Sequence, residues 1–146
     1  MIAVIEFIAV LSCTLFTGAA VYINLVEHPA RMGCGTKTAA TVWAPSYKRA
    51  TVMQALLAML SLVSGVTAWL INHEILWLIS AVLIGLVVPF TLIVIKPTND
   101  QLLAPDRDLA SDETRMLLMK WGRLHAVRSV LGLAASGTYL FVLLKS

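Results

Sequence analysis

Asn24-Leu25-Val26-Glu27-His28-Pro29-Ala30-Arg31 is the stretch in which the first long apolar run of the sequence gives way to polar residues. If the preceding helix continues through it, Asn24 and His28 lie one turn apart, as do Glu27 and Arg31. Polar groups within a membrane are costly, and they usually face a bundle interior or a wet cavity. The stretch is therefore a candidate site. The simpler alternative is a helix end, at which the Glu27–Arg31 pair reaches the headgroups and the proline stops the helix.

The composition of the whole chain indicates a membrane protein. Of its 146 residues, 59% are hydrophobic and only 13% are charged, and the mean hydropathy is +0.85. A water-soluble domain this apolar would expose too much hydrophobic surface. We therefore expect one integral membrane domain over residues 1–146, with the lipid bilayer as its main partner. The net charge of +3 does not point to nucleic acid, because the basic residues crowd into two loops.

Four apolar segments are long enough to cross a hydrocarbon core of about 30 Å. We place them at residues 2–26, 47–71 and 75–95, and within a last helix over 112–144, of which 127–144 crosses the membrane. Four spans with short connections predict an all-α fold, an up-down bundle of four transmembrane helices.

The connections between the spans are expected to be loops at residues 29–44 and 96–111. Pro45 is expected at the first position of the second helix, where a missing N–H is harmless. Pro89 should kink the third span. The cysteines, Cys13 within the first span and Cys34 after it, are not expected to pair.

Three of the spans carry one face of small and polar residues at three- and four-residue spacing, which is typical of helix–helix contacts in membranes. These faces comprise Thr17, Ala20, Asn24 and His28; Tyr47, Thr51, Gln54, Ala58, Ser61 and Gly65; and Leu118, Trp121, His125, Arg128, Gly132, Ala135 and Tyr139. We expect Ser61 with Gly65, and Gly132 with Ser136, to pack against neighbouring helices. Lys120 and Arg123 point elsewhere and are expected to be solvated.

The distribution of basic residues predicts the orientation of the bundle. Of the 11 lysines and arginines, all but Lys145 lie in or beside the first and third connections. Basic connections stay in the cytoplasm. We therefore expect a multi-pass protein of a bacterial-type cytoplasmic membrane, with both termini outside. Trp69 and Trp77 would then mark the outer interface, and Trp43 and Trp121 the inner one.

This topology brings a set of polar residues to the cytoplasmic end of the bundle. They are Asn24, Glu27, His28, Arg31, Tyr47, Arg49, Gln54, Asn99, Trp121, His125 and Arg128. Arg128 counts most, because an unpaired guanidinium in the apolar part of a helix costs at least a few kcal/mol. We expect Glu27 or an anionic ligand to compensate its charge.

Three kinds of chemistry are open to these residues. A histidine could act as general base on an acidic C–H or a phenol, with arginine and asparagine holding the oxyanion. His28 and His125 could instead ligate a haem iron. They could also bind a non-haem metal together with Glu27 as a facial triad. The sequence contains no Glu-x-x-His motif, and two histidines are the minimum for haem, so we expect no cofactor.

A family resemblance supports the first of these alternatives. The motifs that carry it are Asn24-x-x-Glu27-His28-Pro29-x-Arg31, Trp43 followed by Tyr47-x-Arg49, Pro97-x-Asn99-x-x-Leu102, and Trp121-x-x-x-His125-x-x-Arg128. Together they resemble the anthrone oxygenase family of small four-helix membrane proteins, many of them catalogued only as a domain of unknown function. The resemblance implies oxidation of an anthrone to an anthraquinone by molecular oxygen, without metal or flavin. By matching position, it implies a polar pocket of Asn24, His28, Trp121, His125 and Arg128.

The residue chemistry is compatible with that activity on a hydrophobic aromatic small molecule. Trp121 would offer a stacking surface, and His125 or His28 would remove a proton. Arg128 and Asn24 would stabilise the anion and the peroxide that follows. The remaining substrate contacts would come from Glu27, Arg31, Tyr47, Arg49, Gln54 and Asn99.

A non-enzymatic function is the alternative, because fold and family do not fix activity. The chain would then be a scaffold, a homo-oligomer or a subunit of a membrane complex whose polar cluster pins its helices. A bundle that binds haem or another small molecule belongs to the same alternative.

Overall fold

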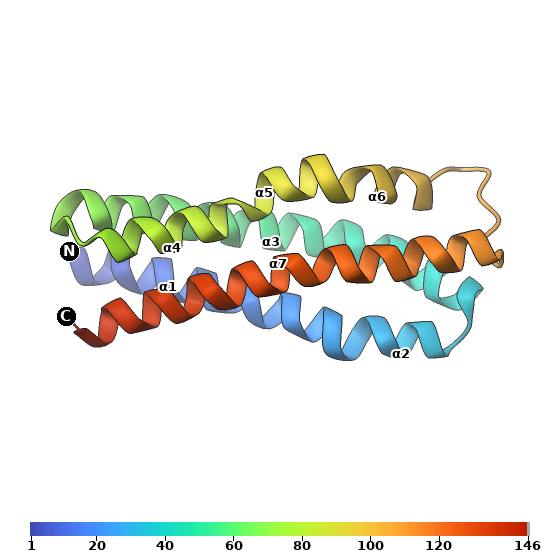
Figure 1. Ribbon diagram of the computed structural model, residues 1–146, viewed down its shortest axis with the longest axis horizontal. Coiled ribbons are helices and arrows are strands. Elements are labelled where there is room, and N and C mark those ends of the chain that lie inside the picture. Colours follow the sequence, from blue (N-terminus) through green and yellow to red (C-terminus); the bar gives the residue numbers. More distant parts are fainter. Residues whose placement is uncertain (146) are drawn as a thin grey trace.

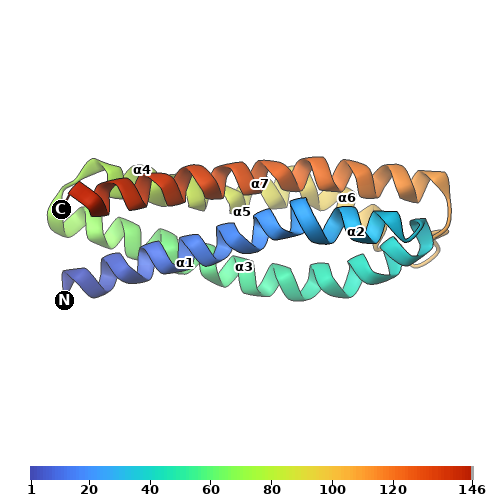
Figure 2. The ribbon, with the colours of Figure 1, turned by 90° about the horizontal axis from the view of Figure 1, so that it is seen from below.

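The computed structural model describes residues 1–145, and within this range all regular structure is helical. Four helical rods, Ile2–Gly33, Thr36–Asn72, Ile75–Leu102 and Asp112–Lys145, are each long and apolar enough to cross a membrane. They run alternately up and down, so that Met1 and the end of the last rod lie at the same end of the bundle (Figures 1 and 2). The predicted fold class is therefore confirmed, and the chain is an integral multi-pass membrane protein.

The first and third rods are interrupted helices, whereas the second and fourth are continuous. The first comprises α1 (Ile2–Tyr22), the π-helical turn η1 (Ile23–Glu27) and α2 (His28–Gly33). The second is α3 (Thr36–Asn72). The third comprises α4 (Ile75–Gly85), α5 (Val87–Phe90), the π-helical turn η2 (Thr91–Ile95) and α6 (Lys96–Leu102). The fourth is α7 (Asp112–Lys145).

The prediction of two long loops at residues 29–44 and 96–111 is wrong, because helices occupy much of both segments. α2 extends to Gly33, a turn at Gly35 with a φ of 89° reverses the chain, and α3 begins at Thr36. Pro45 consequently lies inside α3 and not at its first position. The carbonyl that Pro45 frees belongs to Thr41. Both residues are exposed, so water can reach that carbonyl.

The prolines of the two interrupted rods explain their irregular turns. Pro29 and Pro97 each follow a π-helical turn, η1 and η2 respectively. Proline cannot donate to the carbonyl four residues earlier, and a widened turn absorbs the missing bond. Pro29 therefore reshapes the first rod without ending it. The kink predicted from Pro89 is confirmed, since α4 ends at Gly85 and Figure 1 shows the rod displaced between α4 and α5.

The small and polar faces predicted from the sequence point into the bundle. The seven positions named for the last helix are all buried in α7, whereas Lys120 and Arg123 are exposed. The predicted aromatic belts are wrong for Trp43, Trp77 and Trp121, which are at most 4% exposed. Indole rings are large enough to fill the gaps between helices, and here packing takes precedence over the interface preference.

The expected small-residue contacts are confirmed. Ser61 Oγ donates to the carbonyl oxygen of Ala9 at 3.0 Å, and Ser136 Oγ lies 2.9 Å from Thr17 Oγ1. Gly65 faces the ring of Tyr139, and Gly132 faces Thr17. Cys13 and Cys34 are both free, as predicted.

The orientation of the bundle in the membrane stays a prediction. A reporter attached at Ser146, which lies outside the described residues, is expected on the outer side of the membrane, because the basic connections lie at the opposite end. Fusions to green fluorescent protein and to alkaline phosphatase measure on which side of the membrane the reporter lies. A matched fusion after Ala104 should give the reverse pattern. A cytoplasmic reporter at Ser146 would overturn the assignment.

Candidate functional site

Asn24 is the centre of a polar cluster at the end of the bundle opposite the termini. Its side-chain Nδ2 donates to the carbonyl oxygen of Gly122 at 3.0 Å, which fixes the amide orientation. Its Oδ1 then accepts hydrogen bonds from His125 Nδ1 at 2.8 Å and from Ser129 Oγ at 2.5 Å. Because Oδ1 can only accept, the proton of a neutral His125 lies on Nδ1. Its Nε2 carries the free lone pair and has no hydrogen-bond partner among residues 1–145.

His28 lies in the same cluster but uses both ring nitrogens. Its Nε2 lies 3.0 Å from the carbonyl oxygen of Leu118 and must donate to it, while Nδ1 accepts from Arg31 Nε at 3.3 Å. Although Asn24 and His28 lie one turn apart, they form no hydrogen bond with each other within the described residues, because both side chains reach across to α7. Gly122 permits this approach, since a Cβ there would come within 2.7 Å of the His28 ring.

The Glu27–Arg31 pair predicted from the i and i+4 spacing is present. Glu27 Oε1 lies 3.4 Å from Arg31 Nη1 and accepts a hydrogen bond from Ser46 Oγ at 2.8 Å. The guanidinium of Arg31 also lies over the Trp121 ring, 5.6 Å from its centroid. These contacts join the first rod to α3 and α7.

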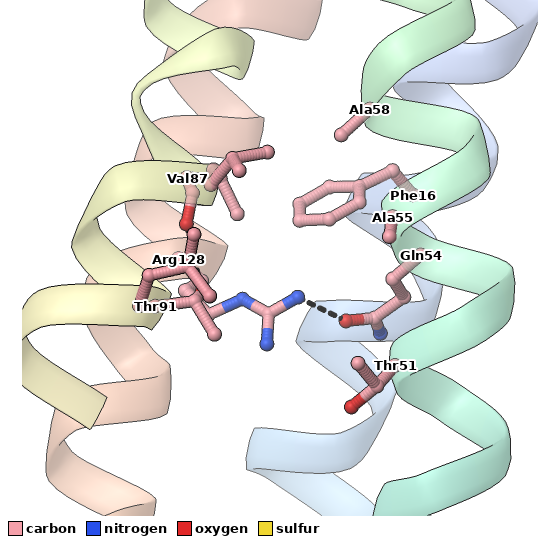
Figure 3. Close-up of a pocket in the computed structure, with 10 residues that line it drawn as sticks. Phe16, Thr51, Gln54, Ala55, Ala58, Val87, Thr91 and Arg128 are labelled. Carbon is pink, nitrogen blue, oxygen red and sulfur yellow. Dashed lines mark hydrogen bonds between the residues drawn. The ribbon is translucent and has the colours of Figure 1, made fainter. Parts of the chain in front are cut away.

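Arg128 projects from α7 into the bundle and is only 7% exposed. Its Nη2 donates to Gln54 Oε1 at 2.6 Å, and its guanidinium lies 5.6 Å from the Phe16 ring centroid (Figure 3). No carboxylate among residues 1–145 pairs with it. The expectation that Glu27 compensates Arg128 is therefore wrong, because Glu27 is engaged by Arg31 and Ser46.

Two buried N–H groups, one of the Arg128 guanidinium itself and one of its partner Gln54, lack an acceptor. They are Arg128 Nε and Gln54 Nε2, neither of which has a hydrogen-bond partner within the described chain. An unmade hydrogen bond of a buried polar group costs about 1–3 kcal/mol, and more for a charged group. The charge and the two free donors together fit an anionic oxygen.

Aromatic rings cover the cluster next to His125. Trp121 stacks on His125, with ring centroids 4.9 Å apart, and meets Trp43 edge-on at 5.8 Å. Trp43 stacks on Tyr47, whose hydroxyl accepts a hydrogen bond from Asn99 Nδ2 at 3.0 Å. Trp121 is thus already covered, and the stacking surface predicted for a substrate is available only if neighbouring side chains move.

Two cavities meet at Arg128. The smaller is about 10 Å³ and is lined by Trp121, His125, Tyr47 and Arg31, among others. The larger is about 100 Å³ and is lined by Phe16, Ala55, Ala58, Val87, Val88 and Leu92, among others. Thr51, Gln54 and Arg128 belong to the lining of both, so the Arg128–Gln54 pair stands between them.

The structure brings together the residues predicted for the site with one exception. Arg49 is exposed on a different face of α3, where it borders a surface hollow with Pro45 and Met53. The facial triad of His28, His125 and Glu27 is not assembled, since residues 1–145 contain no group of three side chains placed to hold a metal.

Sequence reasoning missed Ser46, Gly122 and Ser129. Ser129 had a signal, because it lies four residues after His125 on the same helix. Gly122 could have been suspected as a lone glycine inside a helix. Nothing local in the sequence distinguishes Ser46.

The fold and this cluster define a class: a four-helix membrane protein with a buried polar site. The family model described as anthrone oxygenase matches residues 43–138, which is more than half of the chain. The chain belongs to the anthrone oxygenase family. The match includes Gln54, Trp121, His125 and Arg128, whereas Asn24 and His28 precede it. No curated protein and no solved structure matches the chain.

Proposed function

We propose that the protein is a cofactor-independent oxygenase that oxidises a hydrophobic hydroxyaromatic, anthrone-like or quinol-like, with molecular oxygen. One observation carries the proposal: a histidine with a free Nε2 lines the same small cavity as a buried arginine that has no carboxylate partner among residues 1–145. A base beside an uncompensated cation suits the removal of a proton and the stabilisation of the anion that results. The family membership supports the same reaction class.

His125 is the proposed catalytic base. Its Nε2 removes a proton from the acidic methylene or the phenol of the substrate, and the imidazolium that forms is stabilised by the bond from Nδ1–H to Asn24 Oδ1. The guanidinium of Arg128 and Nε2 of Gln54 hold the oxygen on which the negative charge accumulates. A buried donor is worth more here than in water, because the surroundings screen the charge weakly.

The electron-rich anion then reduces oxygen directly. One electron passes to O2, and the substrate radical and superoxide combine to give a peroxide anion at the former methylene carbon. Transfer of the second methylene proton to the leaving oxygen and cleavage of the O–O bond leave the quinone carbonyl and hydroxide. The hydroxide takes the proton held by His125 and leaves as water, which restores the neutral imidazole. For an anthrone, the methylene carbon loses two hydrogens and gains one oxygen atom, so one O2 is consumed per quinone.

Oxygen uptake by the purified protein in lipid nanodiscs, with an anthrone as substrate, tests this function. Isotope-labelled oxygen should place one labelled atom in the quinone and one in water. Empty nanodiscs are the control, because anthrones also oxidise slowly in air. Uptake no faster than in empty nanodiscs, or hydrogen peroxide in place of water as the reduced product, would contradict the proposal.

A further inference from the structure

The polar end of the bundle is closed by side chains. The Glu27–Arg31 pair and the Ser46 hydroxyl tie the first rod to α3. Beside them, Trp43 is only 1% exposed and stacks on Tyr47. The pocket under this closure holds about 10 Å³, which is the room of roughly one water molecule. A ring-shaped substrate therefore has no open path from water to His125.

The side of the bundle, by contrast, is open between α3 and the third rod. The cavity of about 100 Å³ lies between Ala55 and Ala58 of α3 and the segment from Val87 to Leu92. Ala55 and Leu92 are both exposed, so the cavity reaches the surface there. α3 packs along α4 but meets α5 only sparsely. The displacement of the third rod after Gly85 thus creates an opening within the apolar spans, where lipid surrounds the protein.

The inner end of this opening carries the only charge among the residues that line it. Figure 3 shows the guanidinium of Arg128 extending across the space from α7 towards Gln54 on α3, with Phe16 beside it. At this end of the opening, Arg128 Nε and Gln54 Nε2 are donors that have no acceptor within the described part of the chain. An apolar passage that ends at a cation with free donors selects a molecule with an apolar body and one anionic oxygen.

We propose that the substrate enters from the bilayer, through the opening between α3 and the α5–η2 segment, with its ionisable oxygen leading towards Arg128 and Gln54. This rests on the proposed function and adds the route by which the substrate enters and the orientation in which it arrives. The ligand is a bilayer-dissolved aromatic that carries a single ionisable oxygen at one edge.

The cavity volume decides how such a molecule sits. About 100 Å³ is less than the roughly 150 Å³ of an engineered cavity that holds benzene. The enclosed part therefore takes one ring edge, while the remaining rings of a larger substrate lie in the mouth between Ala55 and Leu92. Beyond the Arg128–Gln54 pair lies His125, so the base meets the edge that carries the ionisable oxygen and takes the proton of its hydroxyl group.

Binding of 9-anthracenecarboxylate, whose carboxylate stands in for the ionised oxygen, tests the route without catalysis. Equilibrium dialysis against the protein in nanodiscs, corrected with empty nanodiscs, should show the acid binding at least about tenfold more tightly than its neutral methyl ester. The double variant Ala55→Phe/Leu92→Phe narrows the mouth from both sides and should weaken binding of the acid at least about tenfold. Both residues are exposed at the mouth, so the fold tolerates the added rings.

The matched control is Leu133→Phe/Ala134→Phe, which makes the same two changes on the exposed face of α7. It should bind within about twofold of the wild type. The route is wrong if the mouth variant binds as tightly as the wild type. Recognition of the anion is wrong if acid and ester bind equally, and both are wrong if the wild type binds neither.

Oxygen uptake in the same nanodiscs separates this inference from the proposed function. If the protein binds the acid but consumes no oxygen with an anthrone, the entry site between α3 and the third rod is supported and the oxygenase activity is contradicted. If the Ala55→Phe/Leu92→Phe variant consumes oxygen at the wild-type rate, the oxygenase activity is supported and the entry route is contradicted.

Discussion

His125→Ala and Arg128→Gln are each expected to lower oxygen consumption with an anthrone by at least about 100-fold, which is the usual scale for losing a general base or an oxyanion donor. The folded proteins should be recovered in close to wild-type yield. Loss of His125 removes the free Nε2, and Asn24 Oδ1 keeps its bond from Ser129. The measurement is turnover per folded protein, with recovery followed by size-exclusion chromatography in detergent.

The contacts of Arg128 explain why its replacement should not unfold the protein. Removing one member of a buried ion pair is costly when its partner stays behind unpaired. Here the partner is the neutral Gln54, and Glu27 keeps its contacts with Arg31 and Ser46. Glutamine at position 128 leaves no buried charge uncompensated, so catalysis and stability should separate at this position.

A purely structural cluster makes the opposite prediction. Asn24 and His28 each bridge the first rod to α7, which suits a scaffold that pins its helices. In that case the His125 and Arg128 variants would change stability without a specific loss of turnover. Lys120→Ala, on the exposed face of the same helix, is the control in both cases. Unaltered turnover in His125→Ala would eliminate it as the base, and His28 could take over that role only by giving up the bond that its Nδ1 accepts from Arg31.

The fold was predictable because its signals are local. Length and hydropathy define four spans, and the three- and four-residue spacing of small residues identifies the faces that meet. Ser61, Gly65 and Gly132 all lie at the contacts that this spacing predicted. The same rule identified the buried face of α7.

The connections were not predictable by these rules, because proline has two outcomes in a membrane helix. It can stop the helix, or a widened turn before it can absorb the missing bond. η1 before Pro29 and η2 before Pro97 show the second outcome. Which outcome occurs depends on how the other rods pack against the helix, and residue type and spacing carry no information about that packing.

The membership of the site was predictable, but its pairing was not. Inward faces at the same end of a bundle must meet, and this rule correctly places Asn24, His125 and Arg128 in one cluster. Which groups bond depends on rotations of a fraction of a turn. The π-helical turn at Ile23–Glu27 aims Asn24 and His28 at α7 instead of at each other, and Arg128 meets Gln54 instead of Glu27. No helical wheel drawn from the sequence contains such a turn.

Gly65→Leu is expected to lower the melting temperature in detergent by roughly 5 °C or more, on the scale of about 1–3 kcal/mol for an overpacked core. A Cβ at position 65 would overlap the hydroxyl of Tyr139 and lie 3.0 Å from Ala81 Cβ. Tyr139 is fully buried and donates to the Ser61 carbonyl oxygen at 3.1 Å, so its ring cannot move aside without losing that bond. The added side chain must therefore push α3 away from α4 and α7.

Gly137→Leu is the matched control, because it makes the same substitution on the outer face of α7, where no atom of residues 1–145 that could be crowded lies within 4 Å of the added Cβ. Leucine favours a helix over glycine by somewhat less than about 1 kcal/mol, so this variant should melt at or slightly above the wild-type temperature. The difference between the two variants isolates the packing term from helix propensity, which both share. If Gly65→Leu and Gly137→Leu have the same melting temperature, the face of α3 that carries Ser61 and Gly65 is turned towards lipid, and the contact with Tyr139 does not hold the bundle together.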